Sequence, residues 1–318
     1  MKPLRIALIT PYLPEARNGN AHTALRWRRC LRAAGHRVRM ALDWDGGAAD
    51  LMIALHARRS AASIRQFAER HPDRPLIVVL TGTDLYRDIL VDASAQASLR
   101  LASHLVVLQE AGLAAVPAEY RGKARVIYQS APSWQPAAKA RSRFEICVVA
   151  HLREEKDPLR AAYAAALLPA ESRIRVRHVG QALAPAWAAE AERCAREIPR
   201  WHWLGPRRHG ETRRLIARSH LLVNSSQMEG GAFVLIEAIS AGVPVLASRI
   251  PGNVGMLGLD YAGYFPYGDT AALAALMRRA ETEPGFYALL QRQCAARAPR
   301  FEPARECAAI EQLIEEAT

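Results

Sequence analysis

The 318-residue chain has little lysine and few cysteines, and it has no long uninterrupted apolar run. Only four of its residues are lysine, so arginine carries nearly all of the positive charge behind a net charge of +12. The chain contains neither the basic runs of nucleic-acid-binding arms nor the spacing of a zinc finger. These absences argue against a nucleic-acid-binding protein, and the positive balance favours small partners that carry phosphate groups.

The cysteines are odd in number and widely spaced, and no C-x-x-C pair occurs among Cys30, Cys147, Cys194, Cys294 and Cys307. This spacing supports neither a disulfide framework nor a zinc site. The first apolar run, at 6–10, is too short for a signal peptide or a membrane span and is better interpreted as a strand. We therefore expect a soluble, cytoplasmic protein without a membrane span, and the sequence leaves the oligomeric state open.

Strand-like apolar runs alternate with amphipathic stretches along almost the whole chain, which is typical of parallel sheets with helices on both faces. Helices are expected at 21–34, 61–69 and 303–318, and an irregular linker at 133–142. Strands are expected at 5–10, 37–42, 51–55, 76–80, 104–108, 125–128, 144–150, 174–179, 201–204, 220–223, 245–248 and 263–265. The pattern predicts an α/β protein of two doubly wound, Rossmann-like domains, at 1–135 and 143–300.

The segment Glu229-Gly-Gly-Ala-Phe-Val-Leu-Ile-Glu237 places two carboxylates eight residues apart, with a helix expected to begin at about Ala232. A helix N-terminus preceded by glycines offers free backbone N–H groups to a phosphate or a polar sugar. Glu229 can accept hydrogen bonds from sugar hydroxyls, and Glu237 can hold the diol of a ribose. The combination favours a nucleotide sugar as the ligand. The alternative is that Glu229 caps the helix and Glu237 is a solvated surface acid.

This segment, with the Ala-Gly-Val-Pro-Val that follows it, resembles the donor-site signature of family 4 glycosyltransferases of the GT-B fold. The resemblance implies two domains that face each other across a cleft, with Glu229 holding the transferred sugar and Glu237 the ribose. It also implies that the backbone at Gly230, Gly231 and Ala232 contacts the donor. In such relatives the last helix, at about 303–318 here, crosses back to the N-terminal domain.

The segment His151-Leu-Arg-Glu-Glu-Lys156 follows the first strand of the second domain and resembles the family segment that binds the donor diphosphate. Two cations three residues apart, Arg153 and Lys156, can flank a pyrophosphate and stabilise its charge as it departs. The alternative is an exposed charge cluster in which Glu154 and Glu155 pair locally with the cations.

Asp43-Trp-Asp45 looks like the D-x-D metal motif of the other major glycosyltransferase fold. It follows the second strand of the first domain, far in sequence from the donor signature, so we interpret it as a turn at Asp45-Gly46. Because Arg153 and Lys156 are available to neutralise phosphate, no metal is required. We expect neither a metal site nor any other cofactor, and a UDP-sugar as a substrate.

Polar residues also follow the predicted strands of the first domain, where ligands bind in open α/β sheets. In a GT-B enzyme these loops face the donor domain, so the candidate acceptor-binding residues are Gly19, Asn20, Thr23, His56, Arg59, Thr81 and Thr83, with Arg58 as a further anion contact. Asn20 is also suited to cap the first helix. Each of these residues has an equally ordinary alternative as a turn or cap. The candidate catalytic residues are Glu229, Arg153, Lys156 and, for an acid/base role, His22 and Asp84.

Three further stretches narrow the resemblance: Gly19-Asn-x-His-Thr-Ala-Leu-Arg-Trp27, Leu80-Thr-Gly-Thr-Asp-Leu-Tyr86 and Gly252-Asn-Val-Gly-Met-Leu-Gly258. They resemble the selenosugar synthases of selenoneine biosynthesis, which transfer N-acetylglucosamine from a UDP donor to selenophosphate. The resemblance implies UDP-N-acetylglucosamine and selenophosphate as the substrates. Two alternatives stay open: a conventional transferase acting on a sugar, lipid or small alcohol, and a protein that binds a nucleotide sugar without turning it over.

Overall fold

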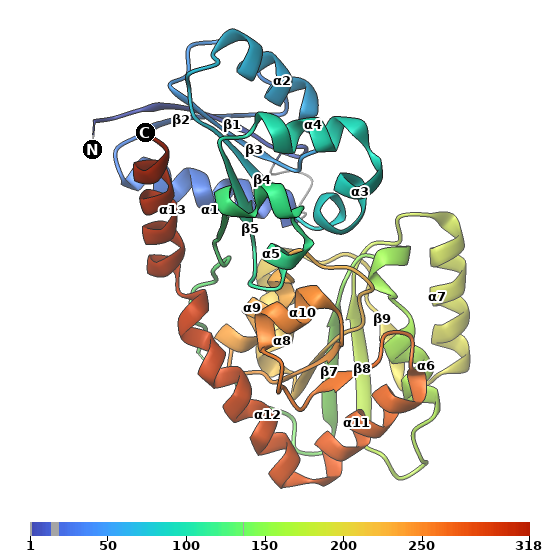
Figure 1. Ribbon diagram of the computed structural model, residues 1–318. Coiled ribbons are helices and arrows are strands. Elements are labelled where there is room, and N and C mark those ends of the chain that lie inside the picture. The colour runs from blue at the N-terminus through green and yellow to red at the C-terminus, as the bar shows by residue number, and fades with distance from the viewer. Residues whose placement is uncertain (1, 14–18, 136) are drawn as a thin grey trace. The chain divides into compact units, whose positions relative to one another are not determined.

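The computed structural model describes residues 2–13, 19–135 and 137–318, and in this part of the chain two compact units each contain a six-stranded parallel sheet (Figure 1). The first unit comprises Met1–Ser130, Glu229–Gly231 and Pro303–Thr318, and the second comprises Ala131–Met228 and Ala232–Glu302. Residues 14–18, part of the polar loop after the first strand, lie outside the described residues. Two doubly wound sheets confirm the predicted α/β class.

The sheet of the first unit has the order β2-β1-β3-β4-β5-β6, with all of its strands parallel. The strands are β1 (Arg5–Ile9), β2 (Arg37–Ala41), β3 (Leu51–Leu55), β4 (Leu76–Leu80), β5 (His104–Val107) and β6 (Ala124–Val126). Every residue of β3 and β4 is buried. Because a central parallel strand is covered on both faces, each of its side chains is buried, and this explains the uninterrupted apolar sequences of both strands.

Helices cover both faces of this sheet. They are α1 (Gly19–Ala33), α2 (Ala61–Arg70), α3 (Ile89–Val91), α4 (Ala93–Leu101), α5 (Gly112–Ala115) and α13 (Pro303–Ala317). One hydrophobic cluster joins α1 and α13 to the sheet, and the other joins α2 and α4 to its opposite face. Gly35, with φ of +91°, ends α1, and the next N–H, of His36, bonds to the Leu31 carbonyl in a Schellman arrangement.

A disulfide between Cys30 of α1 and Cys307 of α13 closes the first unit. The prediction that no disulfide is present was therefore wrong. The two cysteines are 277 residues apart in sequence, and the return of the C-terminal helix to α1 brings their Cα atoms to 5.1 Å. The same contact is reinforced by Arg26, whose Nε lies 3.0 Å from the buried carboxylate of Glu306.

The sheet of the second unit has the order β12-β11-β10-β7-β8-β9 and is also parallel. Its strands are β7 (Phe144–Val149), β8 (Ile174–Val179), β9 (Trp201–Trp203), β10 (Leu221–Asn224), β11 (Val245–Ser248) and β12 (Tyr264–Phe265). Its helices are α6 (Arg160–Ala166), α7 (Pro185–Glu197), α8 (His209–Arg218), α9 (Phe233–Ser240), α10 (Pro251–Leu257), α11 (Thr270–Thr282) and α12 (Pro284–Arg297).

The expected linker at 133–142 has no regular secondary structure in its described residues and packs on the second unit. The N–H of Trp134 bonds to the Ser240 carbonyl, and the guanidinium of Arg213 lies 4.2 Å from the Trp134 ring. Farther along, the ammonium of Lys139 donates to the Ser219 carbonyl at 2.8 Å. Burial of this ammonium lowers the pKa of Lys139 to about 8.

Each predicted strand is present, with small shifts at several ends. The largest of these is at β6, which is Ala124–Val126 where 125–128 was expected. Helix α1 begins at Gly19, so Asn20 lies inside the helix and the expectation that it caps this helix was wrong. No helix within the described residues is long and apolar enough to cross a membrane.

Candidate functional site

The segment after β7 carries the candidate diphosphate-binding cations. Residues Glu154–Lys156 form one 3-10 turn, which the Lys156 N–H closes by donating to the Arg153 carbonyl at 3.1 Å. Asp157 then adopts a left-handed conformation with φ of +42°, and α6 begins at Arg160. The expected helix start is thus a tight turn that places Arg153 and Lys156 at the carboxyl end of β7.

The segment after the neighbouring strand β10 bonds directly to this turn. Ser225 Oγ donates to the Asp157 carbonyl at 2.8 Å, and the Gln227 N–H donates to the Glu155 carbonyl at 2.9 Å. Strands β7 and β10 are parallel neighbours, so their carboxyl ends lie at the same edge of the sheet. Two motifs about seventy residues apart in sequence are therefore joined in one framework.

The turn carries charges of both signs, because Arg153 and Lys156 lie among Glu154, Glu155 and Asp157. Arg153 Nε is shielded from solvent and has no hydrogen-bond partner among the described residues, but it forms an ion pair with Glu155 at 3.8 Å, so the alternative of local pairing holds for this cation. The pKa of His151 is lowered, first by burial and then by the charges of Arg153 and Lys156. The unsatisfied Nε donor of Arg153 suits an anionic ligand.

Glu237 lies in the second turn of α9 and is 7% exposed, so it is not the solvated surface acid of the alternative interpretation. Its Oε1 lies 2.6 Å from Nε2 of His209, the first residue of α8. His209 was not among the site residues predicted from the sequence. Only its position just after Gly205-Pro-Arg-Arg, at a predicted strand end, could have indicated it.

Helix α9 begins at Phe233, one residue after the predicted start, with Ala232 as its N-cap residue. Glu229 is 8% exposed and precedes this cap in an irregular segment. By their contacts, Glu229–Gly231 group with the first unit, whereas Ala232 and the helix belong to the second.

A buried polar network fixes the end of β10. Ser248 Oγ donates to the Ser226 carbonyl, and Asn253 Nδ2 donates to the Ser248 carbonyl at 2.9 Å. The Asn224 side-chain oxygen accepts from the Ser226 N–H at 3.2 Å. All four side chains are at most 5% exposed. Asn253 is the asparagine of the Gly-Asn-x-Gly-Met-Leu-Gly stretch, so these hydrogen bonds give a structural reason for the asparagine at this position.

In the first unit, His56 has an unusual backbone with φ of +74° and is 2% exposed. Its Nδ1 accepts the Arg59 N–H at 3.4 Å, and its Nε2 lies 3.2 Å from Thr83 Oγ1. A left-handed conformation in a residue other than glycine stores strain and is found preferentially at functional positions. The structure thus brings His56, Arg59 and Thr83 together at the ends of β3 and β4. Arg59 also lies over the ring of Tyr12, at 5.1 Å.

Asp84 is fully buried, and both of its carboxylate oxygens accept backbone N–H bonds. Oδ1 accepts from Thr81 and Gly82, each at 2.9 Å, and Oδ2 accepts from Ala57 at 3.0 Å. These bonds tie the loop after β4 to the loop after β3. Asp88, which was not predicted as a site residue, pairs with the guanidinium of Arg58 at 2.8 Å.

The other candidates of the first unit lie in the first turns of α1. Thr23 is buried, and its hydroxyl donates to the Gly19 carbonyl at 2.8 Å and accepts from the Gln129 side chain at 2.6 Å. Asn20 and His22 are partly buried in the same turns. Thr23 is therefore held within the unit, whereas Asn20 and His22 retain some exposure to solvent.

The Asp43-Trp-Asp45 segment forms a turn, as interpreted from the sequence. Asp45 accepts the Gly47 N–H at 3.1 Å and pairs with Arg39 at 2.6 Å, and Gly46 has φ of +81°. Across the described ranges, no group of three or more His, Cys, Asp or Glu side chains is placed to hold a metal ion.

The family model "Glycosyl transferases group 1" matches residues 134–300, which include every candidate donor residue. The chain belongs to the glycosyl transferase group 1 family. A curated relative, glycosyltransferase 1 domain-containing protein 1 of Xenopus tropicalis, is 29% identical over 158 residues. That match covers 48% of this chain and 44% of the relative, so the chain spans less than half the length of the relative it matches.

Solved structures resemble the whole chain. HepE of Anabaena, in complex with UDP and glucose, matches with a TM-score of 0.79 at 17% identity, over 98% of this chain and 100% of that one. Sucrose-phosphate synthase from Thermosynechococcus elongatus matches with a TM-score of 0.78 at 16% sequence identity, over 98% of each chain. A glycosyltransferase from Rickettsia africae matches with a TM-score of 0.75 at 12% sequence identity, over 100% of this chain and 99% of that one. These likenesses confirm the GT-B fold.

Proposed function

We propose that this family member is a cytoplasmic, UDP-sugar-dependent glycosyltransferase that transfers N-acetylglucosamine from UDP-N-acetylglucosamine to selenophosphate. Membership of the glycosyl transferase group 1 family supports the reaction class. The choice of sugar and acceptor rests on the resemblance of the Gly19–Trp27, Leu80–Tyr86 and Gly252–Gly258 stretches to selenosugar synthases.

One observation carries the nucleotide-sugar part of the proposal. The Arg153–Asp157 turn and the Ser225–Gln227 segment are hydrogen-bonded to each other at one edge of the second sheet. This places the two cations beside the segment that leads into Glu229 and α9. A donor diphosphate bound there would meet Arg153, Lys156 and the backbone amides that precede the helix.

In this proposal Glu237 binds the ribose hydroxyls of the donor. Its burial strengthens each hydrogen bond that it makes, and His209 holds one of its oxygens in place. Glu229 accepts hydrogen bonds from the transferred sugar. When the bond between C1 of the sugar and UDP breaks, Arg153 and Lys156 stabilise the negative charge that develops on the leaving diphosphate.

The candidate acceptor residues lie in the first unit, and their proposed role follows from the chemistry of selenophosphate. Selenium of selenophosphate attacks C1, the C1–O bond to UDP breaks, and UDP leaves with the electron pair. Because selenophosphate is already deprotonated, the reaction needs positioning and charge neutralisation more than a strong general base. We accordingly assign Asp84, whose oxygens are engaged with backbone N–H groups, to positioning the Thr81–Thr83 loop. The proposed contacts for the acceptor are Gly19, Asn20, Thr23, His56, Arg59, Thr81 and Thr83, and His22 stays the candidate for an acid/base role.

The test is mass spectrometry of the purified protein with UDP-N-acetylglucosamine, with and without selenophosphate. We expect UDP and a selenium-bearing sugar only when selenophosphate is present, and far less of both products from Arg153→Ala. Replacing selenophosphate by phosphate controls for general anion effects. UDP release with a sugar, lipid or alcohol acceptor and none with selenophosphate would sink the selenosugar proposal while keeping the transferase. UDP binding without turnover of any acceptor would contradict both.

A further inference from the structure

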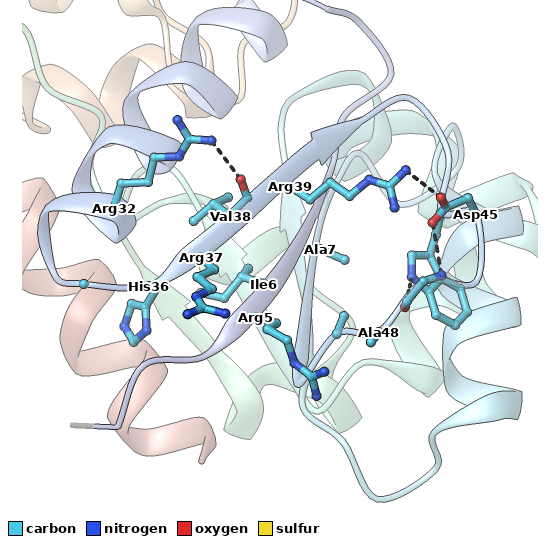
Figure 2. Close-up of a pocket in the computed structure, with 14 residues that line it drawn as sticks. Arg5, Ile6, Ala7, Arg32, His36, Arg37, Val38, Arg39, Asp45 and Ala48 are labelled. Carbon is cyan, nitrogen blue, oxygen red and sulfur yellow. Dashed lines mark hydrogen bonds and ion pairs between the residues drawn. The ribbon is translucent and has the colours of Figure 1, made fainter.

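The first sheet has a gap in its helical covering. Strand β2 connects to β3 across β1 through residues 42–50, without a helix. Ala7 of β1 packs in the cluster that contains α2, so the odd-numbered residues of β1 point to the α2 face of the sheet. At the β1–β2 end of this face a pocket of about 570 Å³ is present (Figure 2).

Arginines line this pocket because of the strand register. Arg5 of β1 is paired with Arg37 of β2, and Ala7 with Arg39, so three guanidinium groups rise from one face of two adjacent strands. The small side chain of Ala7 leaves space between them. Arg32, in the last turn of α1, lies at the rim, where its Nη2 donates to the Val38 carbonyl at 3.1 Å (Figure 2).

Only part of this charge is neutralised. Arg5 pairs with Asp50 and Arg39 pairs with Asp45, both at 2.6 Å. The guanidinium of Arg37 has no hydrogen bond or ion pair within the described part of the chain, and Arg32 meets only a neutral carbonyl. Burial lowers the pKa of the neighbouring His36, whose Nδ1 accepts the Leu4 N–H.

We propose that this pocket binds a small polyanion that carries at least two phosphate groups, at a site separate from the donor and acceptor sites. Guanidinium groups hold phosphate oxygens with paired, charge-assisted hydrogen bonds, and two of those in the pocket have no carboxylate partner. Arg5 and Arg37 begin their strands, whereas the acceptor candidates His56 and Thr81 follow the carboxyl ends of theirs. The site does not depend on the proposed transfer reaction.

The test is calorimetric titration of the full chain with inorganic pyrophosphate while excess UDP occupies the donor site. We expect binding to persist, and the Arg32→Ala/Arg37→Ala variant to bind at least ten-fold more weakly. Arg37→Glu provides a second, single change at an exposed position. The control is Arg100→Ala, which removes one exposed arginine charge from α4, over a different part of the sheet. Absence of pyrophosphate binding under UDP, or an equal loss in Arg100→Ala, would overturn the proposal.

A second arm identifies the source of the phosphate. Wild type and both pocket variants are sedimented with phosphatidylcholine vesicles that do or do not contain a phosphoinositide. If the wild type sediments with the phosphoinositide vesicles and the pocket variants do not, the ligand of the site is a lipid headgroup. Pyrophosphate binding without vesicle retention would assign it to a soluble phosphorylated molecule. Either result supports the site, because the clustered phosphate is common to both ligands.

Discussion

The carboxylate oxygen Oε1 of Glu237 lies 2.6 Å from Nε2 of His209, a residue 28 positions earlier that begins a different helix. If Glu237 binds the ribose, Glu237→Ala should weaken UDP binding by roughly 10- to 100-fold, the range expected when a charged hydrogen-bonding group is removed. Calorimetric titration with UDP measures this loss. Glu192→Ala, which removes an exposed acid of α7, should bind UDP like the wild type. Unchanged affinity in Glu237→Ala would remove Glu237 from the donor site.

The contact with His209 predicts coupling between the two residues. His209→Ala should weaken UDP binding less than Glu237→Ala does, because His209 acts through the orientation of Glu237. The double variant should lose less UDP-binding free energy than the sum of the losses in the two single variants, since the second change removes an interaction that is already absent. Strictly additive losses in the same titrations would show that His209 does not position Glu237.

Arg153→Ala should lower the turnover of UDP-N-acetylglucosamine by roughly 100- to 1000-fold, because a group that stabilises charge on the departing diphosphate is lost. Arg153→Lys should restore only part of the rate, since an ammonium cannot reproduce the fork of a guanidinium. UDP release in the presence of selenophosphate is the measurement. The control is Arg292→Ala, an exposed arginine of α12. Wild-type turnover in Arg153→Ala would contradict the assignment.

The Cys30–Cys307 disulfide should stabilise the oxidised protein by about 2–4 kcal/mol, because it closes a very long loop in the unfolded chain. Denaturant unfolding with and without dithiothreitol measures this difference. In Cys307→Ser, reductant should have no further effect, since no other disulfide is present among the described residues. A reducing cytoplasm, the location that we propose, disfavours disulfides, so alkylation and peptide mapping of protein taken directly from cells would show which form predominates in them.

His178 predicts a loss of stability in mild acid. Its burial lowers its pKa to about 4, from an ordinary value of 6.5, and its Nε2 lies 2.9 Å from the Ala150 carbonyl oxygen. Between pH 6.5 and 4 the unfolded chain therefore binds a proton that the folded chain excludes, so stability falls as the pH falls.

The test compares wild type with His178→Gln, which keeps a donor near the Ala150 carbonyl. The difference in unfolding free energy between the two proteins should change by on the order of 3 kcal/mol from pH 8 to pH 4. Parallel curves for the two proteins over this pH range would show that His178 does not cause the loss.

Much of the fold was predictable because parallel strands leave a strong local signal. Buried on both faces, β3 and β4 need apolar side chains at every position, and their bounds were predicted without error. The bounds of edge strands were predicted less accurately. In β6 only one residue of three is buried, so the apolar pattern that marks the strand is weak.

The candidate donor residues were identified by their spacing and by resemblance, but their partners were not. The link between the Asp157 carbonyl and Ser225 uses backbone atoms, which leave no signature in the side-chain sequence. His209 was missed for a related reason. A histidine at a helix start has many ordinary roles, and only the packing of α8 beside α9 sets it against Glu237.

The sequence by itself determined the succession of strands and helices, and hence two doubly wound sheets, because burial periodicity is local. It also placed Arg153, Lys156, Glu229 and Glu237 after or near strand ends, where α/β proteins bind ligands. Tertiary structure alone decided which distant groups meet. The Cys30–Cys307 disulfide, the Glu237–His209 contact and the arginine pocket of β1 and β2 all depend on chain return or on strand register. Such contacts join residues far apart in sequence, and no local pattern encodes them.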